Sequence, residues 1–386
     1  MKDKNRQILE GSRAIALTIK NIAPDVISAY PITPQTHIVE DLAKFKADGL
    51  ANYEYLRAES EFAAASIVLG ASAAGSRVYS ATSSQGLLLM TEVIFSITGL
   101  RLPIVMTCAN RTISSPINIW NDHQDIMALT ASGWIMLFAE TNQEAVFQHI
   151  LAYKIAETTK LPVMVNVDGF ILTHSYEPLS IPEAGKIKKY LGQYHPAAGT
   201  YLDTKNPVTL GSFVSPKDYF EIRQELNDDL IASLKTINQE YFKCHKALGT
   251  SGTKNENGLF EYYGPRNAKT IIIALGSVIG TIKDVADQQK NVGVIKIKCF
   301  NPFPYQDLAK ILKSAKQIAI LEKATNLGSA APLFSRILPI LNRDQVAKSY
   351  IAGLGGRDIT QKMIQGIIND IMKTKKTSLD SKFVNK

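Results

Sequence analysis

Residues 30–34 of the sequence, Tyr-Pro-Ile-Thr-Pro, form a turn in which side-chain and backbone groups could bind a small anion or a polar ligand. The preceding residues 24–29 include the β-branched and small residues of a buried strand, and the two prolines of the turn exclude any regular element there. Apolar residues recur at helical spacing over 38–45, so the turn leads into a helix N-terminus. A rigid turn with the Thr33 hydroxyl beside a helix N-terminus is typical of an anion site. From the turn alone, a structural corner of an α/β domain is an equal alternative.

Glu61 is the second candidate for chemistry. It opens an alanine-rich helix predicted over residues 61–74, where the helix dipole favours a carboxylate. An acidic residue at a helix N-terminus needs no further role, and Glu59 precedes it closely enough to share one. In the functional interpretation, a half-buried Glu61 pairs with the nitrogen of a heterocycle, and burial tunes its proton affinity.

Arg111 follows a strand predicted over residues 102–108. A guanidinium forks onto carboxylates and phosphates, and its strand-end position would direct it to the same edge as Thr33; a surface arginine is the equal alternative. The polar run Asn-Asp-His-Gln-Asp at 121–125 offers metal ligands, but one histidine beside two aspartates lacks the spacing of a zinc site. We favour a structural or interface loop for this run and predict no metal site.

Strands and helices that alternate along the chain must position these residues. This alternation indicates an α/β fold with a doubly wound, mostly parallel sheet covered by helices on both faces. The polar signatures all fall at the carboxyl ends of predicted strands, where such folds bind ligands. They are residues 30–34, 82–86, 110–111 and 168–169. We therefore expect one ligand site at this edge of the sheet.

Length and composition exclude several classes of protein. The chain has 386 residues, enough for two domains, and its net charge of +8 comes from lysines spread along it. No basic helix with interleaved aromatics occurs, so we expect no nucleic-acid partner. No apolar stretch reaches the roughly 18 residues of a membrane helix, and the N-terminus lacks an apolar signal core, so we expect no membrane association and a cytoplasmic protein.

Several motifs are absent. The three cysteines are far apart, which argues against a disulfide framework, a zinc ribbon or an iron–sulfur cluster held by this chain alone. The phosphate-binding loop, the Gly-x-Ser-x-Gly elbow and the His-Glu-x-x-His motif are missing as well. The common nucleotide-binding, hydrolase and zinc-protease interpretations therefore do not apply.

The pattern along the chain predicts four segments. Residues 1–180 form the first α/β domain, and 181–262 form a connection with one long charged helix. Residues 263–375 form a second, smaller α/β domain, and 376–386 form a basic tail.

Five motifs in order resemble the α subunit of 2-oxoacid:ferredoxin oxidoreductases, most nearly the pyruvate:ferredoxin (pyruvate synthase) type. They are Tyr30-Pro31-Ile32-Thr33-Pro34, Glu59-Ser60-Glu61, Ala81-Thr82-Ser83-Ser84-Gln85-Gly86-Leu87, Asn110-Arg111 and Asn121-Asp122-His123-Gln124-Asp125. The resemblance covers nearly the whole chain. It implies a pyrimidine-type thiamine diphosphate-binding domain followed by a transketolase C-terminal-like domain.

The resemblance also implies a reaction and roles for residues. The family decarboxylates pyruvate with thiamine diphosphate, passes electrons through iron–sulfur clusters to ferredoxin, and delivers the acetyl group to coenzyme A. Glu61 matches the glutamate that binds the aminopyrimidine nitrogen, and Thr33 and Arg111 match the residues that hold the 2-oxoacid. The implied cofactor-binding positions are Glu61, Tyr30, Pro31, Thr33, Thr82, Ser84 and Gln85.

Partner chains must supply what this chain lacks. It has no Gly-Asp-Gly with a distant Asn for diphosphate and Mg²⁺, and no spacing of cluster ligands. The resemblance therefore places Mg²⁺ and the [4Fe-4S] clusters on β, γ and δ subunits, separate or fused, with thiamine diphosphate shared with the β subunit. Two alternatives stay open: a subunit for another 2-oxoacid, such as 2-oxoglutarate or a branched-chain acid, and a non-catalytic assembly subunit.

Overall fold

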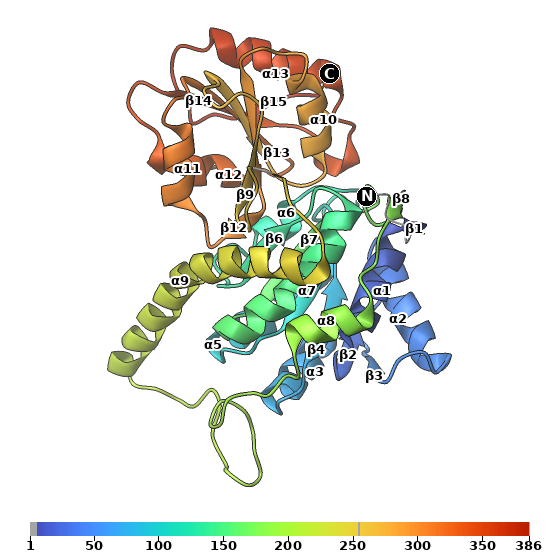
Figure 1. The fold of residues 1–386 in the computed structure, drawn as a ribbon. Helices are drawn as coiled ribbons and strands as arrows, with labels where there is room; N and C mark the ends of the chain where they lie inside the picture. The colour runs from blue at the N-terminus through green and yellow to red at the C-terminus, as the bar shows by residue number, and fades with distance from the viewer. Residues whose placement is uncertain (1–5, 254, 386) are drawn as a thin grey trace.

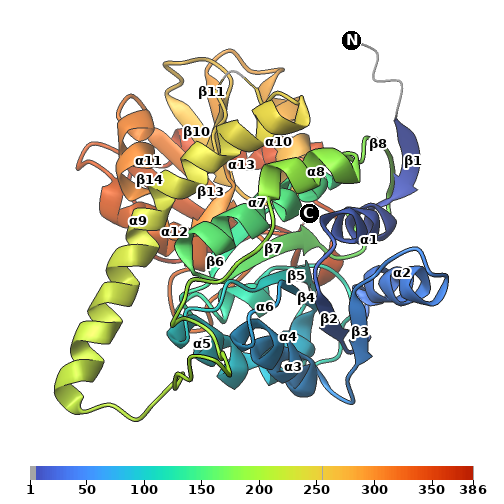
Figure 2. The same ribbon diagram turned by 60° about the horizontal axis from the view of Figure 1, so that its bottom comes forward.

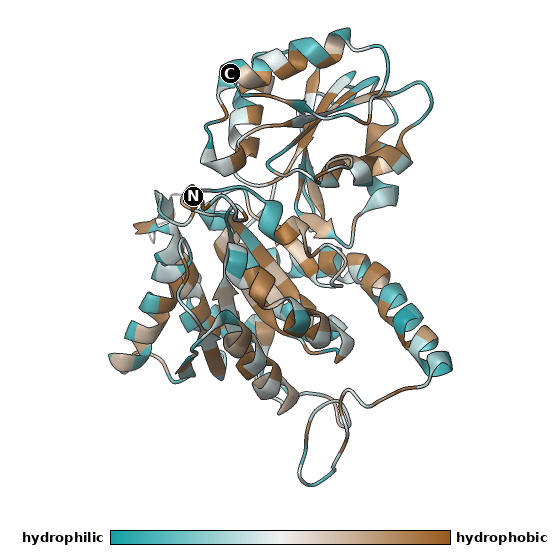
Figure 3. Cartoon of the chain, turned by 180° about the vertical axis from the view of Figure 1, so that it is seen from behind, coloured by the Kyte–Doolittle hydropathy of each residue, from teal (hydrophilic) through white to brown (hydrophobic). Residues whose placement is uncertain are grey.

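β-Branched and apolar runs form the strands of two large sheets in the computed structural model, which describes residues 6–253 and 255–385. Figure 1 shows the two sheets in separate units, one above the other, with a long helix beside the junction. Apolar residues, brown in Figure 3, concentrate in the strands and alternate with polar ones along the helices, and the buried ones form the core clusters. None of the described helices is both long and apolar enough to span a bilayer.

The first sheet has seven strands in the order β12-β6-β7-β5-β4-β2-β3. All neighbours in it are parallel except β12 and β6, which are antiparallel. Its strands are β2 (Val26–Ala29), β3 (Glu54–Arg57), β4 (Val78–Thr82), β5 (Val105–Asn110), β6 (Ile135–Phe138), β7 (Val163–Asp168) and β12 (Cys299–Asn301). The predicted doubly wound parallel sheet is thus confirmed. The carboxyl ends of β2, β4, β5 and β7 lie along one edge.

Helices cover both faces of this sheet, with α1, α7 and α8 on one face and α3, α4 and α5 on the other (Figure 2). They are α1 (Gly11–Ile22), α2 (Thr36–Ala47), α3 (Glu61–Ala73), α4 (Ser84–Leu89), α5 (Thr91–Gly99), α6 (Gln124–Met127), α7 (Asn142–Thr159) and α8 (Ala184–Leu191). A separate antiparallel ribbon of β1 (Gln7–Glu10) and β8 (Tyr176–Leu179) lies beside α1. The sequence predicts a helix from residue 7, but β1 occupies the first four of those positions because they pair with β8.

The second sheet has six strands in the order β15-β14-β13-β10-β11-β9. They are β9 (Phe260–Tyr263), β10 (Thr270–Ala274), β11 (Val292–Ile297), β13 (Gln317–Glu322), β14 (Val346–Ile351) and β15 (Lys382–Phe383). The helices around it are α10 (Val278–Ala286), α11 (Tyr305–Leu312), α12 (Pro332–Ile337), η1 (Leu338–Ile340), η2 (Leu354–Gly356) and α13 (Gln361–Lys373). The second domain is predicted over residues 263–375, but the sheet extends beyond both bounds. β9 begins before residue 263 and pairs with β11, and β15 lies after residue 375 and pairs with β14.

The long helix α9 (Pro216–Leu248) connects the two units. It begins with a cap, since the Ser215 hydroxyl accepts a hydrogen bond from the Asp218 amide, and it ends at Gly249 in the left-handed conformation. Its second half packs on α7, whereas its first half extends away from both units (Figures 1 and 2).

A short strand and buried ion pairs fix the second unit to the first. β12 follows β11 directly in the chain but pairs with β6 of the first sheet. Beside it, the Lys296 ammonium lies 2.8 Å from Glu140 and 3.3 Å from Glu144. Burial opposes the ionisation of Glu144, but Lys296 and Lys298 outweigh it and lower the pKa of this carboxyl. Lys296 belongs to the second unit, and Glu140 and Glu144 belong to the first. Moving the units apart would leave these buried charges without partners, which is costly, so the ion pairs hold the two units in one arrangement.

Candidate active site

The turn at residues 30–34 is joined to two neighbouring strand ends. The Thr33 side chain is exposed, and its backbone carbonyl accepts a hydrogen bond of 2.9 Å from Nη1 of Arg111. Gln35 is fully buried behind the turn, where Nε2 donates to the carbonyls of Tyr30 at 3.0 Å and Ala81 at 2.9 Å. The turn after β2 is therefore bound to the end of β4 and to the arginine after β5.

Glu61 is the first residue of α3, and its side chain is turned inward. The Ser60 hydroxyl caps the helix by accepting from the Ala63 amide at 3.2 Å, which places Glu61 in the first turn. Glu61 is only 8% exposed. A Cβ atom added to Gly86 would lie 2.7 Å from Oε1 of Glu61 and 2.7 Å from Oγ1 of Thr82. Any side chain larger than that of glycine at position 86 would therefore collide with the Glu61 carboxylate and the Thr82 hydroxyl.

Both of these polar groups lack hydrogen-bond partners among the described residues. The Thr82 hydroxyl is buried and makes no hydrogen bond to any residue in the ranges 6–253 and 255–385. No group in the same ranges donates a hydrogen bond to the Glu61 carboxylate. Buried polar groups are nearly always hydrogen-bonded, so an unpaired carboxylate beside an unpaired hydroxyl indicates a site for a ligand with polar atoms.

Ser84 and Gln85 are the first two residues of α4, which begins directly after β4 and the N-cap residue Ser83. Ser84 has a positive φ of 49°, which is uncommon outside glycine. Its hydroxyl donates to the carbonyl of Thr112 and contacts Oε1 of Gln85. The Ser84 hydroxyl is thus used within the chain, and so is its backbone amide, which donates to Asp125.

Asp125 is a central positioning residue that sequence reasoning did not single out. It is fully buried, and its carboxylate accepts hydrogen bonds from the backbone amides of Ser84 at 3.1 Å and Arg111 at 2.9 Å and from the side-chain amide of Asn110 at 3.1 Å. Burial raises the pKa of Asp125 to about 6, although these donors act in the opposite direction. One side chain therefore fixes the turn after β4 relative to the residue after β5.

Arg111 lies at the surface of this arrangement with part of its hydrogen-bonding capacity unused. Its Nε donates to the Asn118 carbonyl at 3.2 Å and its Nη1 to the Thr33 carbonyl, while Nη2 has no partner among the described residues. Burial lowers the pKa of the guanidinium from its usual value, and the nearby Asp125 carboxylate opposes this. The guanidinium remains charged and offers one side of its fork to an anion.

The end of β7 is organised differently, because Asp168 is fully paired. Its carboxylate lies 2.7 Å from Nζ of Lys323 and 2.6 Å from Nε2 of His123, and it accepts from the backbone amide of Ser277 at 2.9 Å. Burial disfavours its charge, but Lys323 and His123 outweigh burial and hold the pKa of Asp168 well below its usual range. Lys323 and Ser277 belong to the second unit, so this end of the sheet edge is an interface.

The predicted site residues thus divide into two contact groups on one edge. Thr33 contacts Arg111, and Glu61 and Thr82 both lie against Gly86. The loop at 121–125 is buried and lies at the interface, in agreement with its structural interpretation. Sequence reasoning missed Gln35 and Asp125 as positioning residues. Gln35 is a polar residue next to a turn, and Asp125 belongs to a dense polar run. The spacing of such residues in the sequence does not distinguish buried ones from solvent-facing ones.

Comparison with known proteins gives matches along nearly the whole chain. Residues 18–243 match the thiamine diphosphate-binding domain of pyruvate flavodoxin/ferredoxin oxidoreductases, and residues 268–364 match core domain II of pyruvate:ferredoxin oxidoreductase. Pyruvate synthase subunit PorA of Methanocaldococcus jannaschii is 46% identical, with 96% of each chain covered. The subunit of the same name from Thermotoga maritima is 42% identical, with 95% of this chain and 94% of the relative covered.

More distant relatives act on other substrates by name. Ketoisovalerate oxidoreductase subunit VorA of Pyrococcus horikoshii is 35% identical over 95% of this chain and 94% of the relative. A solved structure of 2-oxoglutarate:ferredoxin oxidoreductase from Magnetococcus marinus matches with a TM-score of 0.75 at 20% identity. That match covers 97% of this chain, which spans 66% of the length of the solved chain, and at this identity it shows the fold alone. From the near-complete matches at higher identity, the chain belongs to the pyruvate flavodoxin/ferredoxin oxidoreductase family, and its first domain is the thiamine diphosphate-binding domain of that family.

Proposed function

We propose that the chain is the α subunit of a pyruvate:ferredoxin oxidoreductase. The enzyme converts pyruvate and coenzyme A to acetyl-CoA and CO₂, transfers the electrons to ferredoxin, and also operates in reverse as a pyruvate synthase. The observation that supports a catalytic role most directly is the buried Glu61 carboxylate without a partner in the described chain. The names of the most similar relatives support pyruvate as the substrate.

The residues at the sheet edge fit the aminopyrimidine half of thiamine diphosphate. An aminopyrimidine offers a ring nitrogen and an exocyclic amine, which match an unpaired buried carboxylate and an unpaired buried hydroxyl. In this proposal Glu61 binds the ring nitrogen and Thr82 binds a neighbouring polar atom. When bound, thiamine diphosphate supplies the electron sink that the decarboxylation of a 2-oxoacid requires.

Glu61 holds a proton at the ring nitrogen in this proposal. The Ser60 cap and the contact with Gly86 fix the carboxylate in place. Tyr30, Pro31 and the backbone of Ser84 and Gln85 form the adjoining walls, since all follow the ends of β2 and β4.

Arg111 and Thr33 bind the head of the substrate in this proposal. The unused Nη2 atom of Arg111 donates to the carboxylate of the 2-oxoacid, and the exposed Thr33 hydroxyl donates to its oxygen atoms. The existing contact between Nη1 and the Thr33 carbonyl orients the guanidinium before the substrate arrives.

The active enzyme is a complex with partner subunits in this proposal. Relatives of nearly equal length carry the word subunit in their names. The face formed by α3, α4 and α5 exposes large apolar side chains, Phe62 at 40%, Leu89 at 52% and Phe95 at 38%, as surfaces that bind partners do. We assign the Mg²⁺–diphosphate site and the [4Fe-4S] clusters to β, γ and δ partners, and we place the complex in the cytoplasm with ferredoxin and coenzyme A.

A subunit for another 2-oxoacid is the second candidate. It is favoured by the 35% identity with a ketoisovalerate oxidoreductase subunit. Arg111 and Thr33 would recognise the head group that all 2-oxoacids share, so they do not select a side chain. A non-catalytic assembly subunit is disfavoured, because packing alone would not require an unpaired buried carboxylate.

The test is an anaerobic assay of the complex co-produced with its partner subunits. Reduction of a viologen dye is measured with coenzyme A and with pyruvate, 2-oxoglutarate or a branched-chain 2-oxoacid. We expect pyruvate to give the highest kcat/KM. A preference for another 2-oxoacid would keep the reaction and replace the substrate, whereas a complex that binds thiamine diphosphate and reduces no dye with any 2-oxoacid would overturn the catalytic assignment.

A further inference from the structure

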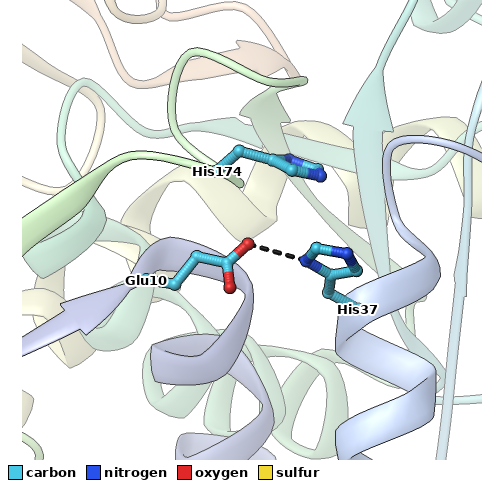
Figure 4. A group of neighbouring side chains, drawn as sticks. All are labelled: Glu10, His37 and His174. Atoms are coloured by element: carbon cyan, nitrogen blue, oxygen red, sulfur yellow. Dashed lines mark hydrogen bonds and ion pairs between the residues drawn. The ribbon is translucent and has the colours of Figure 1, made fainter.

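Glu10, His37 and His174 gather at a second place on the first domain (Figure 4). Glu10 ends β1, His37 lies in the first turn of α2, and His174 lies in the loop between β7 and β8. One nitrogen or oxygen atom from each side chain lies within 4.8 Å of those of the other two. Nδ1 of His37 and Oε1 of Glu10 are 2.7 Å apart, and the rings of His37 and His174 have centroids 4.6 Å apart.

We propose that these three side chains bind one divalent first-row transition-metal ion, of the Zn²⁺ class. Two imidazoles and one carboxylate are the ligands found in protein zinc sites that keep a fourth position open for water or another ligand. The carboxylate balances one of the two positive charges of a divalent ion, and the two neutral imidazoles add donor nitrogens without charge. No metal site is predicted from the sequence here because these residues belong to no short motif: His37 follows Glu10 by 27 positions.

The geometry needs only small rotations of side chains to accept the ion. Ligand atoms around a tetrahedral zinc ion lie roughly 3.4 Å apart, since Zn–N and Zn–O bonds are about 2.0–2.2 Å long. The separation of 2.7 Å between Glu10 and His37 must widen, and atoms up to 4.8 Å apart must close. The side chain of His37 is 47% exposed and that of Glu10 is 17% exposed, so both have space at the surface in which to turn.

Neighbouring groups hold His174 in position. Its Nδ1 lies 2.7 Å from Oγ1 of Thr173, which in turn accepts a hydrogen bond of 2.8 Å from the Phe170 amide. The Phe170 ring packs against His174 with centroids 4.7 Å apart. A hydrogen bond of this kind commonly fixes the tautomer and orientation of a histidine that ligates a metal.

A bound ion would add one more link among three segments that already contact one another through the β1–β8 ribbon and the packing of α1 on α2. It would connect the β1–α1 junction and the beginning of α2 to the loop that follows Asp168. The ion would therefore stabilise the edge of the domain from outside the site of Glu61 and Thr82. This inference does not depend on the proposed reaction.

The experiment measures metal binding by the purified full-length chain. The protein is treated with a chelator, dialysed, and titrated with Zn²⁺ by calorimetry, and then with Co²⁺ while the visible spectrum is recorded. We expect one ion per chain and a Co²⁺ spectrum typical of nitrogen and oxygen ligands. Zn²⁺ should also raise the melting temperature of the chain, because it binds the folded state.

Three variants and one control decide the assignment. Glu10→Gln, His37→Asn and His174→Asn should each weaken Zn²⁺ binding by at least about 100-fold, more than the loss of an outer hydrogen bond typically does. The control His195→Asn changes an exposed histidine outside the cluster and should bind as wild type does. Circular dichroism confirms folding, and Glu10 and His37 variants suffice if His174→Asn does not fold. Absence of stoichiometric binding, or binding that these variants leave unchanged, would overturn the proposal and leave only the Glu10–His37 ion pair.

Discussion

Glu61 and Asp168 are both buried carboxylates at the carboxyl edge of the first sheet, and they have opposite surroundings. Glu61 is 8% exposed and Asp168 is 1% exposed. Asp168 is bound by Lys323, His123 and Ser277, whereas Glu61 has no hydrogen-bond donor among the described residues. Since a buried charge is costly unless it is paired, Asp168 is paired by the protein itself, whereas the Glu61 carboxylate is left for solvent or a ligand to pair.

Along this one edge of the sheet, the end of β7 contributes to stability and the other strand ends carry the groups available for function. The second domain covers the end of β7 and supplies Lys323 and Ser277, so this end is saturated and joins the two units. After the ends of β3, β4 and β5 the chain leaves Glu61, Thr82 and Nη2 of Arg111 without partners among the described residues. Substitutions at the two ends should therefore change different measurable properties.

The largest expected effect is that of Glu61→Gln on turnover. Loss of a group that acts in proton transfer lowers kcat by about 10²-fold to 10⁴-fold. The assembled complex should keep its melting temperature, because no internal hydrogen bond is lost. Steady-state kinetics and thermal unfolding measure both. The control is Glu59→Gln, which changes an exposed neighbour and should keep wild-type turnover; near-normal turnover of Glu61→Gln would exclude the proposed role.

Asp168→Asn should produce the converse result. Removing one partner of a buried ion pair costs about 3–5 kcal/mol of the free energy of unfolding, because Lys323 remains buried without its counter-charge. Urea unfolding of the full chain measures this loss. In the control Asp344→Asn, which breaks an exposed pair with Lys316, the stability should stay near that of wild type. Equal stability of Asp168→Asn and this control would mean that the interface pair is not needed.

The dependence of the unfolding free energy on pH tests the effect of burial on Asp125. Burial raises the pKa of the folded state to about 6 from the ordinary 3.8, so the folded state binds the proton more tightly than the unfolded state. The contribution of Asp125 to the free energy of unfolding is therefore fully present below about pH 4 and is lost as the pH rises through about 6. At 1.36 kcal/mol per pKa unit, the total loss is about 3 kcal/mol.

The measurement compares urea unfolding of wild type and Asp125→Asn between pH 4 and pH 7. The difference in unfolding free energy should move in favour of the variant as the pH rises, because the amide that replaces the carboxyl group does not titrate. Asp168, with its pKa held low, should contribute in the opposite direction and only in more acidic solution. A difference that is independent of pH would show that Asp125 ionises at its ordinary pKa.

Much of this fold could be predicted from the sequence, because buried parallel strands are continuous apolar runs. β4, β5 and β7 fall where those runs lie, and the polar residues that follow them mark the carboxyl edge. β3 was missed because it is a half-exposed edge strand of sequence Glu-Tyr-Leu-Arg. β12 was missed because its pairing with β6 depends on how the two units pack, which no local pattern contains.

The sequence predicts that the candidate site lies at the carboxyl edge of the first sheet, but it does not predict which side chains contact one another there. The motif positions of Thr33, Glu61 and Arg111 were visible in the sequence, and their roles remain proposals. The function of Asp125 depends on three donors from distant segments. The Glu10–His37–His174 cluster could not be predicted for the same reason, because residues that the fold brings together from distant segments form no motif in the sequence.

Arg111→Ala should have a moderate effect that is confined to substrate binding. A hydrogen bond to a charged group contributes about 1.5–3 kcal/mol, so we expect the KM for pyruvate to rise by about 10-fold to 150-fold. The affinity for thiamine diphosphate should stay close to that of wild type. Arg343→Ala, an exposed arginine of the second domain, is the control. An unchanged KM in Arg111→Ala would remove this residue from the substrate site.

Thr82→Val should have the smallest effect and gives the finest test of the comparison. The buried Thr82 hydroxyl has no described partner, so its removal should leave the stability of the free chain unchanged or raise it slightly. Thiamine diphosphate binding to the complex should weaken by about 2-fold to 10-fold, as expected for one neutral hydrogen bond of about 0.5–1.5 kcal/mol. Calorimetric titration measures the affinity, and urea unfolding measures the stability.

Thr107→Val is the matched control for Thr82→Val, since Thr107 is equally buried on the adjacent strand β5. Its hydroxyl lies 2.6 Å from the Tyr79 hydroxyl and 2.6 Å from Nε2 of His149. The Thr107 substitution leaves these two groups unpaired and should cost about 1–3 kcal/mol of stability, with little change in thiamine diphosphate affinity. If Thr82→Val instead loses as much stability as Thr107→Val and binds the cofactor normally, then Thr82 has a structural partner and the unpaired groups at this edge do not mark the cofactor site.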